Sequence, residues 1–442
     1  MEALKEQDVL IIGGGVSGTA LLYLLSHYTD IQKITLLEKY KTIASVNSHG
    51  RNNSQTLHCG DIETNYTIEK ARQVQRTAKM VVNYATKQAN KDDIIYKFPK
   101  MVIGVGSKEC ESLRKRFEEF KPYYDGMQLF DANDIAKIEP TVTAGREDEV
   151  IALAVVDEYS AVNFQALSQS FVAQAMGIKN KDISIATDTK VKTITKVDDG
   201  YEVITNKGVY RSRFVVVSAG GHSLLFAHNM GYGLEYSCLP MAGSFYYAPN
   251  MLNGKVYTVQ NDKLPFAAIH GDPDVLVSGK TRFGPTALAL PLLERYNLRT
   301  FPEFLKVFKP DLDVLKSLWG LLKISDIRNY MFKNVLFEIP FIRERLFLKD
   351  VKKIIPNMKL SDLSFAKQTG GIRPVMIDKK NHKLHLGEAQ LNPGNGIIFN
   401  MTPSPGATSC LGNAEKDMKI IVDYLGAGFD AERFERDLHN ET

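Results

Sequence analysis

The N-terminal part of the chain alternates short apolar runs with a glycine-rich turn. The runs "DVLII", ending at Ile12, and "KITLLEK", beginning at Lys33, each have the length of a buried strand. Between them lie the turn "GGGVSG" and the apolar stretch "TALLYLLSHY", which suits a well-buried helix. The pattern therefore predicts strand, turn, helix and strand, in that order.

The rest of the chain changes its hydrophobic period several times. Residues 67–89 repeat apolar positions every three and four residues, which indicates a long amphipathic helix. Residues 182–220 form short runs joined by the tight turns "DDG" and "NKG", which indicate strands. The pattern then becomes strand-rich over 234–290 and helical over 301–355, and it ends over 396–425 with a strand, a Pro/Gly turn and a long helix.

These elements predict an α+β protein built on an α/β nucleotide-binding core. The sequence has neither an internal repeat nor a low-complexity linker, so we expect two domains that are interleaved along the chain. We assign residues 1–90, 150–230 and 360–442 to a discontinuous cofactor domain. We assign residues 91–149 and 231–359 to a substrate domain with a mixed sheet.

Composition narrows the class of protein. The chain has 442 residues, of which 44% are hydrophobic and 24% charged, as in ordinary globular proteins. Its start has no basic region followed by a long apolar run, so we expect neither a secretory signal nor a transmembrane helix. The four cysteines are far apart, so we expect no disulfide scaffold or metal site, and a reducing cytoplasm. A net charge of +4 is too small to indicate nucleic acid as a partner.

The charge is concentrated in the predicted helical segment. Residues 295–359 contain 14 basic and 7 acidic side chains, an excess of seven positive charges. Within this stretch, residues 301–356 interleave the lysines with Leu, Ile, Phe and the only tryptophan, Trp319. Basic amphipathic helices of this kind bind the interface of anionic membranes. The alternative is that they pack on their own domain and leave the lysines in water.

The glycine-rich turn has the features of a dinucleotide site. Gly13, Gly15 and Gly18 form G-x-G-x-x-G between a predicted strand and a predicted helix, where a pyrophosphate can approach the backbone amides. Glu38 ends the second strand, where a carboxylate can accept hydrogen bonds from both ribose hydroxyls.

Other signals favour FAD as the dinucleotide. A second G-x-G-x-x-G, which a separate nicotinamide module would use, is absent from the sequence. Near the C-terminus the turn "PSPGATS" precedes a helix, and amides at such a helix start stabilise the negative charge of a reduced flavin. We therefore assign to the cofactor site, besides the residues above, Gly14, Lys39, Ser54, Gln55, Val191, Ala219, Gly220, Gly406, Ala407 and Thr408.

Several longer motifs resemble the malate:quinone oxidoreductase family over nearly the whole chain. They include "VLIIGGGVSG", "CLPMAGSFYY", "LPFAAIHGDPD", "RFGPTALALP", "GGIRP" and "TPSPGATSC". The resemblance implies an FAD domain of the D-amino-acid-oxidase and glutathione-reductase type. It also implies that FAD takes a hydride from L-malate to give oxaloacetate, and that the electrons pass to a membrane quinone and feed the tricarboxylic acid cycle and the respiratory chain. The enzyme would then lie on the inner face of the cell membrane.

The resemblance also assigns candidate catalytic residues. The reaction needs a base for the hydroxyl proton, and we expect His270, at the end of an apolar run, to be that base. It also needs cations for two carboxylates, and we expect Arg282 and Arg373 to bind them, with Lys280 as an auxiliary group. His58 is expected near the flavin.

Two other functions stay open from the sequence. The stretch "NSQTLHCG" is similar to "NSGVIHSG" of the L-2-hydroxyglutarate oxidases, which share the fold and the chemistry. The glycine turn alone would also suit a dinucleotide-binding protein with no turnover. Reduction of the flavin by malate, by 2-hydroxyglutarate or by neither would separate the three.

Overall fold

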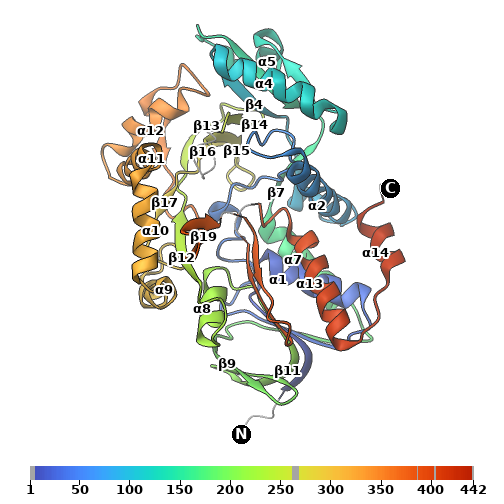
Figure 1. The fold of residues 1–442 in the computed structure, drawn as a ribbon. Helices are drawn as coiled ribbons and strands as arrows, with labels where there is room; N and C mark the ends of the chain where they lie inside the picture. The colour runs from blue at the N-terminus through green and yellow to red at the C-terminus, as the bar shows by residue number, and fades with distance from the viewer. Residues whose placement is uncertain (1–4, 261–267, 386, 403–404, 441–442) are drawn as a thin grey trace.

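The computed structural model describes residues 5–260, 268–385, 387–402 and 405–440 (Figure 1). Its first sheet has six strands in the order β21-β22-β11-β1-β2-β8, and β10 and β9 extend it from β11. The predicted succession at the N-terminus is present as a strand, a helix that begins directly after the glycine turn, and a parallel neighbouring strand. The elements of this part are β1 (Lys5–Ile12), α1 (Val16–Tyr28), β2 (Lys33–Leu37), β8 (Asp182–Ala186), β9 (Val191–Val197), β10 (Gly200–Thr205), β11 (Gly208–Val217), β21 (Ala389–Leu391) and β22 (Ile397–Met401).

Helices cover the first sheet and bury its apolar side chains. α1 packs in one core cluster with α2, α7 and the long closing helix α13. The predicted helix over 67–89 is α2, and its first turn is capped by the Thr67 hydroxyl, which accepts from Lys70 N. These helices are α2 (Ile68–Thr86), α7 (Phe164–Met176), α13 (Cys410–Leu425) and α14 (Ala431–Leu438), while α8 (Gly221–Asn229) packs elsewhere, against β22 and β12.

Two further sheets form the other half of the molecule. One has eight strands in the order β18-β13-β16-β15-β14-β4-β6-β5, and the other has four in the order β17-β12-β19-β20. The eight strands are β4 (Lys100–Val105), β5 (Gln128–Phe130), β6 (Val150–Val155), β13 (Tyr246–Pro249), β14 (Lys255–Thr258), β15 (His270–Pro273), β16 (Lys280–Gly284) and β18 (Ser364–Phe365). The four are β12 (Tyr236–Ala242), β17 (Leu288–Ala289), β19 (Ile372–Asp378) and β20 (Lys383–His385).

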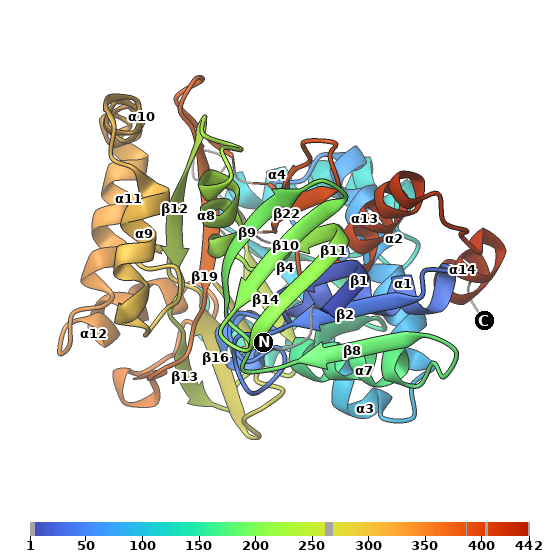
Figure 2. The same ribbon diagram turned by 90° about the horizontal axis from the view of Figure 1, so that it is seen from below.

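The predicted helical segment forms a separate outer layer. It contains α9 (Phe301–Phe308), α10 (Leu312–Lys323), α11 (Ser325–Leu336) and α12 (Arg343–Val351). Figure 2 shows these helices stacked beside β12 and β19, on the side away from the first sheet. Within the described part of the chain, none of the helices is both long and apolar enough to span a bilayer.

Some strand pairs cross the predicted domain boundaries. β6, which the sequence interpretation placed in the cofactor domain, pairs with β4 and β5 of the eight-stranded sheet. β18 and β19 lie within the predicted cofactor segment 360–442, yet they pair with β13 and β12 of the other half, and β20 extends the same sheet by pairing with β19. Strand pairing, which the local pattern does not encode, decides both cases.

Candidate active site

A cavity of about 1020 Å³ is lined by residues from both halves of the molecule. The first half contributes the glycine turn after β1 and the ends of β2, β11 and β22. The second half contributes the end of β12, part of β14 and the start of β19, and the loop over residues 44–66 completes the lining. A cavity at the carboxyl ends of parallel strands is where α/β folds bind their ligands.

The glycine turn allows the backbone to be approached closely. Gly13 has φ +115°, and a Cβ there would lie 2.3 Å from Ser218 O. A Cβ at Gly18 would lie 2.0 Å from Gly13 O, so this glycine permits the tight packing of α1 on the turn. Gly15 precedes the first residue of α1 and lines the cavity with Gly13. The cavity thus faces the start of α1, as an anionic pyrophosphate requires.

Glu38 lies where the sequence predicts an acid. Its carboxylate lines the cavity and accepts hydrogen bonds from Gly14 N at 2.8 Å and Tyr40 N at 2.9 Å. Burial raises the pKa of Glu38, and the two amide hydrogen bonds oppose that rise. Lys39 also lines the cavity, and it forms an ion pair with Glu294.

Most of the other predicted cofactor residues also face this cavity. Those that line it are Ser54, Val191, Ala219, Gly220, Gly406, Ala407 and Thr408. Gly14 and Gly18 do not line the cavity: Gly14 N donates to Glu38, and Gly18 packs against Gly13. Pro403 and Ser404 of the "PSPGATS" motif lie outside the described residues.

Gln55 does not line the cavity. Its side chain is fully buried and donates to Asp274 Oδ1 at 3.1 Å and to Gly50 O at 3.2 Å. Its amide oxygen accepts from Val275 N at 3.0 Å. Gln55 thus anchors the loop that carries Ser54, and a direct contact with the cofactor does not fit this placement.

His58 lies in the cavity wall and has a carboxylate partner. Its Nδ1 is 2.7 Å from Glu63 Oε1, and its backbone N donates to Thr408 Oγ1 at 3.1 Å. Burial alone would raise the pKa of Glu63, but the hydrogen bond from His58 and its charge outweigh burial, and the pKa is lowered. An ionised carboxylate only accepts, so Nδ1 of His58 carries a proton, and Nε2 is an acceptor when the imidazole is neutral. The pair has the orientation of a general base with its positioning acid.

Arg373 is a second cavity residue whose side chain could bind a substrate. It lies near the start of β19, directly opposite Met241 of β12. Within the described ranges, its guanidinium makes no hydrogen bond or ion pair with protein groups. Burial lowers the pKa of Arg373, and the neighbouring Tyr330 hydroxyl opposes this. The Arg373 side chain is half-buried at the cavity, and a guanidinium there with no protein partner among the described residues suits a bound carboxylate.

His270 lies one side chain behind the cavity. It is buried in β15, its Nδ1 is 2.7 Å from Asp272 Oδ1, and its ring stacks on Tyr257 at 4.5 Å between centroids. Tyr257 lines the cavity, whereas His270 is not among the lining residues. Burial lowers the pKa of His270, and Asp272 opposes this. The described structure thus places His58, and not His270, in direct reach of a ligand.

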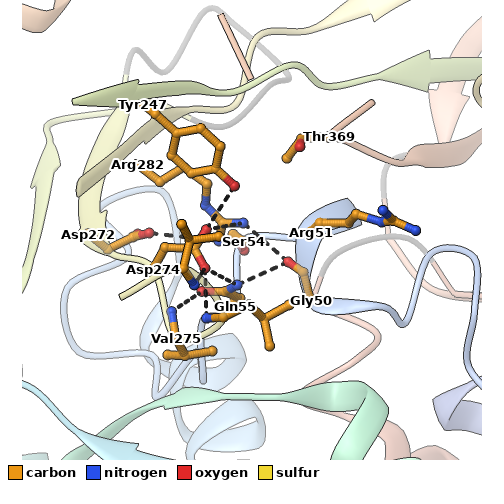
Figure 3. A network of polar contacts seen from close by, with 12 residues as sticks. Gly50, Arg51, Ser54, Gln55, Tyr247, Asp272, Asp274, Val275, Arg282 and Thr369 are labelled. Atoms are coloured by element: carbon orange, nitrogen blue, oxygen red, sulfur yellow. Dashed lines mark hydrogen bonds and ion pairs between the residues drawn. The ribbon is translucent and has the colours of Figure 1, made fainter. Parts of the chain in front are cut away.

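Arg282 belongs to a buried ionic cluster and not to the cavity wall (Figure 3). It is fully buried, lies 3.5 Å from Asp274 and 3.9 Å from Asp272, and donates to Gly50 O at 3.1 Å. Lys280 is exposed at the start of β16 and is also absent from the lining. The predicted second carboxylate clamp is therefore corrected: these Gly- and Pro-flanked cations pair with buried acids or face water.

The structure also brings in residues that the sequence interpretation missed. Thr56, Glu63, Tyr66 and Tyr257 all line the cavity. Glu63 had a signal, because it follows His58 by five residues in "HCGDIE". Tyr257 had no such sequence signal, because a tyrosine in a short strand ordinarily serves to pack the sheet.

Comparisons with known proteins agree with this architecture. Residues 5–411 match the family model described as malate:quinone oxidoreductase (Mqo). A probable malate:quinone oxidoreductase of Campylobacter jejuni is 49% identical over 98% of this chain and 99% of that protein. A malate:quinone oxidoreductase of Helicobacter pylori is 46% identical over 99% of this chain and 98% of that protein.

Solved structures share the fold at low identity. L-α-glycerophosphate oxidase from Mycoplasma pneumoniae, solved with FAD bound, has a TM-score of 0.64 at 19% identity, covering 95% of each chain. Glycine oxidase from Geobacillus kaustophilus has a TM-score of 0.65 at 15% identity, covering 99% of this chain and 100% of that one. The predicted fold class is thereby confirmed. Because the family model matches residues 5–411, which is most of the chain, this chain belongs to the malate:quinone oxidoreductase family.

Proposed function

We propose that this chain oxidises L-malate to oxaloacetate with FAD bound in the cavity, and passes the electrons to a membrane quinone. The observation that carries the proposal is the composition of one cavity wall. A dinucleotide-type glycine turn, a His–carboxylate pair and a half-buried arginine that pairs with none of the described acids line the same cavity, in a member of the malate:quinone oxidoreductase family.

The residues present fit FAD. At Gly13 and Gly18 a Cβ would collide with backbone, so the turn lies close against its surroundings and leaves the cavity beside Gly15 open to a pyrophosphate. Glu38 directly follows β2, where its carboxylate can bind the ribose. Gly406, Ala407 and Thr408, from the turn before α13, also line the cavity. When bound, FAD supplies the hydride acceptor that side chains lack.

The side chains of the cavity bind the substrate and accept its proton. Arg373 binds a carboxylate of malate, and its planar guanidinium orients the substrate through two parallel hydrogen bonds. Nε2 of His58 accepts the proton of the 2-hydroxyl, and the charge that develops on the ring is stabilised by Glu63 at Nδ1. His270 and Asp272 support Tyr257 from behind.

An anaerobic titration tests this function. Addition of L-malate should bleach the flavin absorbance of the purified holoenzyme, and 2-hydroxyglutarate at equal concentration should not. His58→Ala should retain FAD and lower the rate of flavin reduction by roughly 10²-fold or more. His270→Ala serves as the comparison and should cost less. A larger loss in His270→Ala than in His58→Ala would return the role of base to His270.

We also propose that the outer helical layer binds anionic lipid, on the inner face of the cell membrane. In α10, Leu312, Leu315, Trp319 and Leu322 are exposed at helical spacing, with Trp319 63% exposed. In α11, Phe332 and Val335 are exposed, and Ile339 continues the same spacing. Together with the excess of seven positive charges over 295–359, this composition suits an anionic membrane interface. Electrons delivered there to quinone would feed the respiratory chain, with oxaloacetate returning to the tricarboxylic acid cycle.

A further inference from the structure

A row of buried charged side chains lies behind the cavity, on neighbouring strands of the eight-stranded sheet. Lys255 of β14, Asp272 of β15 and Arg282 of β16 are each at most 1% exposed. Lys255 Nζ lies 3.3 Å from Asp272 Oδ1, and Arg282 Nη2 lies 3.9 Å from Asp272 Oδ2. A fully buried lysine is rare, because desolvation disfavours its charged form. Its position therefore calls for a physical reason.

Lys255 touches the cavity only through other side chains. Its ammonium donates to Thr56 Oγ1 at 3.2 Å, and Thr56 Oγ1 lies 2.8 Å from the Tyr257 hydroxyl. Thr56 and Tyr257 line the cavity, and Lys255 does not. A continuous chain of hydrogen-bonding groups thus runs from a buried cation to the surface of the substrate cavity.

The direction of this chain follows from the chemistry of its members. An ammonium group can only donate, so Thr56 Oγ1 accepts from Lys255. The single Thr56 proton has two acceptors within reach, Ser54 O at 3.1 Å and the Tyr257 oxygen at 2.8 Å. When Thr56 donates to Tyr257, the Tyr257 proton points away from Thr56 and is available to a ligand. Burial raises the pKa of Tyr257 well above its ordinary value, so the hydroxyl keeps that proton.

An anion in the cavity favours this direction over the other. A chain in which every donor points from a cation towards an anion is polarised at each step and strengthened. A substrate with two carboxylates provides such an anion twice, and Arg373 accounts for only one of them. Arg282, the cation that the sequence suggested for the second, is held by Asp272, Asp274 and Gly50.

We propose that Lys255 is a positioning residue for the substrate, which acts through Thr56 to make Tyr257 a hydrogen-bond donor to the carboxylate that Arg373 does not bind. The inference rests on the proposed function, because it presumes a dicarboxylate in the cavity. It assigns Tyr257 a direct contact with the substrate. It also gives the buried lysine a role that a neutral residue of similar volume could not fill.

Three variants of the holoenzyme test the chain link by link. Tyr257→Phe removes the terminal donor and keeps the ring that stacks on His270. Thr56→Val removes the middle link with almost no change in volume and leaves every buried ion pair in place. Lys255→Met removes the cation. Tyr247→Phe is the matched control: this hydroxyl donates to Asp274 at 3.2 Å from the same sheet but does not line the cavity.

The primary measurement is the dissociation constant of oxaloacetate, followed by the perturbation of the oxidised flavin spectrum, so that no turnover is required. A hydrogen bond to a charged group contributes roughly 1.5–3 kcal/mol, which corresponds to about a 10- to 160-fold weakening for Tyr257→Phe. Thr56→Val and Lys255→Met should weaken binding in the same direction, and Tyr247→Phe should leave it unchanged. Combining Lys255→Met with Tyr257→Phe should weaken binding no further than Tyr257→Phe alone.

The outcomes separate this inference from the proposed function. If malate fails to bleach the wild-type flavin, the proposed function is wrong. If malate bleaches it but Thr56→Val and Tyr257→Phe bind oxaloacetate like the wild type, only the role of the chain is wrong. Fully additive losses in the double variant would overturn the link between Lys255 and Tyr257. Because Lys255→Met leaves Asp272 beside an apolar side chain and can unfold the protein, the same double-variant comparison is made with Thr56→Val and Tyr257→Phe, and fully additive losses there would also overturn the chain.

Discussion

Exchanging Arg282 and Arg373 for Met in separate variants should affect two different properties of the protein. Arg282 is fully buried against Asp272 and Asp274, so its loss leaves two buried carboxylates with less compensation. Removing one partner of a buried pair costs about 3–5 kcal/mol. We expect the lower end, about 3 kcal/mol, because Asp272 keeps Lys255 and Asp274 keeps Gln55.

This loss converts into a measurable shift of the melting temperature. Unfolding entropy is about 2.1 cal/mol/K per residue, or about 0.9 kcal/mol/K for the 442 residues. Arg282→Met should thus melt about 3 °C lower in calorimetry. Its apparent malate dissociation constant, from anaerobic flavin bleaching, should stay within about twofold of the wild type.

Arg373→Met should show the converse behaviour. Its guanidinium has no protein partner in the described part of the chain, so its loss should change the melting temperature little. Loss of the guanidinium that pairs with a substrate carboxylate costs about 2–5 kcal/mol in binding, and the malate dissociation constant should rise about 30-fold or more. If Arg282→Met weakened malate binding as much as Arg373→Met, the assignment of Arg282 to a structural cluster would be refuted.

Three further predictions follow from other parts of the structure. Gly15→Val should place a side chain at the cavity wall beside α1 and abolish FAD binding, so that the variant purifies colourless; a yellow variant with full flavin content would contradict the site. Leu315→Ser combined with Trp319→Ser should reduce pelleting with anionic vesicles at low salt, whereas Tyr424→Ser, at an exposed aromatic residue of α13, should not; equal pelleting of all three proteins would exclude the helical layer as the lipid surface. Burial raises the pKa of Asp417 to about 7, so the folded protein binds this proton more tightly than the unfolded chain does. The free energy of unfolding that this proton contributes is therefore lost as pH rises from about 4 towards 7. Asp417→Asn should therefore gain stability relative to the wild type between pH 5 and pH 8 in urea unfolding, and a constant difference would refute the shift.

Most of the cofactor residues that the sequence predicts line the cavity, because this part of the molecule is encoded locally. A tight turn needs glycine where φ is positive, as at Gly13, and a helix must start directly after it. Glu38 is fixed by the same short unit, since it ends the strand next to the turn. The motif therefore carries its own geometry within about thirty residues, as βαβ nucleotide sites do.

The substrate half of the site is decided by contacts between distant segments. Arg282 and Arg373 have similar surroundings in sequence, both flanked by Gly or Pro. Only strand pairing places Arg282 opposite Asp272, and it places Arg373 at the cavity, where the guanidinium forms no ion pair with any acid in the described ranges. In the same way, His58 and His270 each have an acid within five residues, and the loop over 54–63 decides which of them lines the cavity.

The sequence by itself therefore determined the class of fold, the dinucleotide turn and the family, because local backbone geometry and composition carry that information. The tertiary structure decided which histidine and which arginine can reach a ligand. That decision depends on burial and on the pairing of charges brought together from strands far apart in the chain, since a cation already satisfied by a buried carboxylate is not available to bind a substrate.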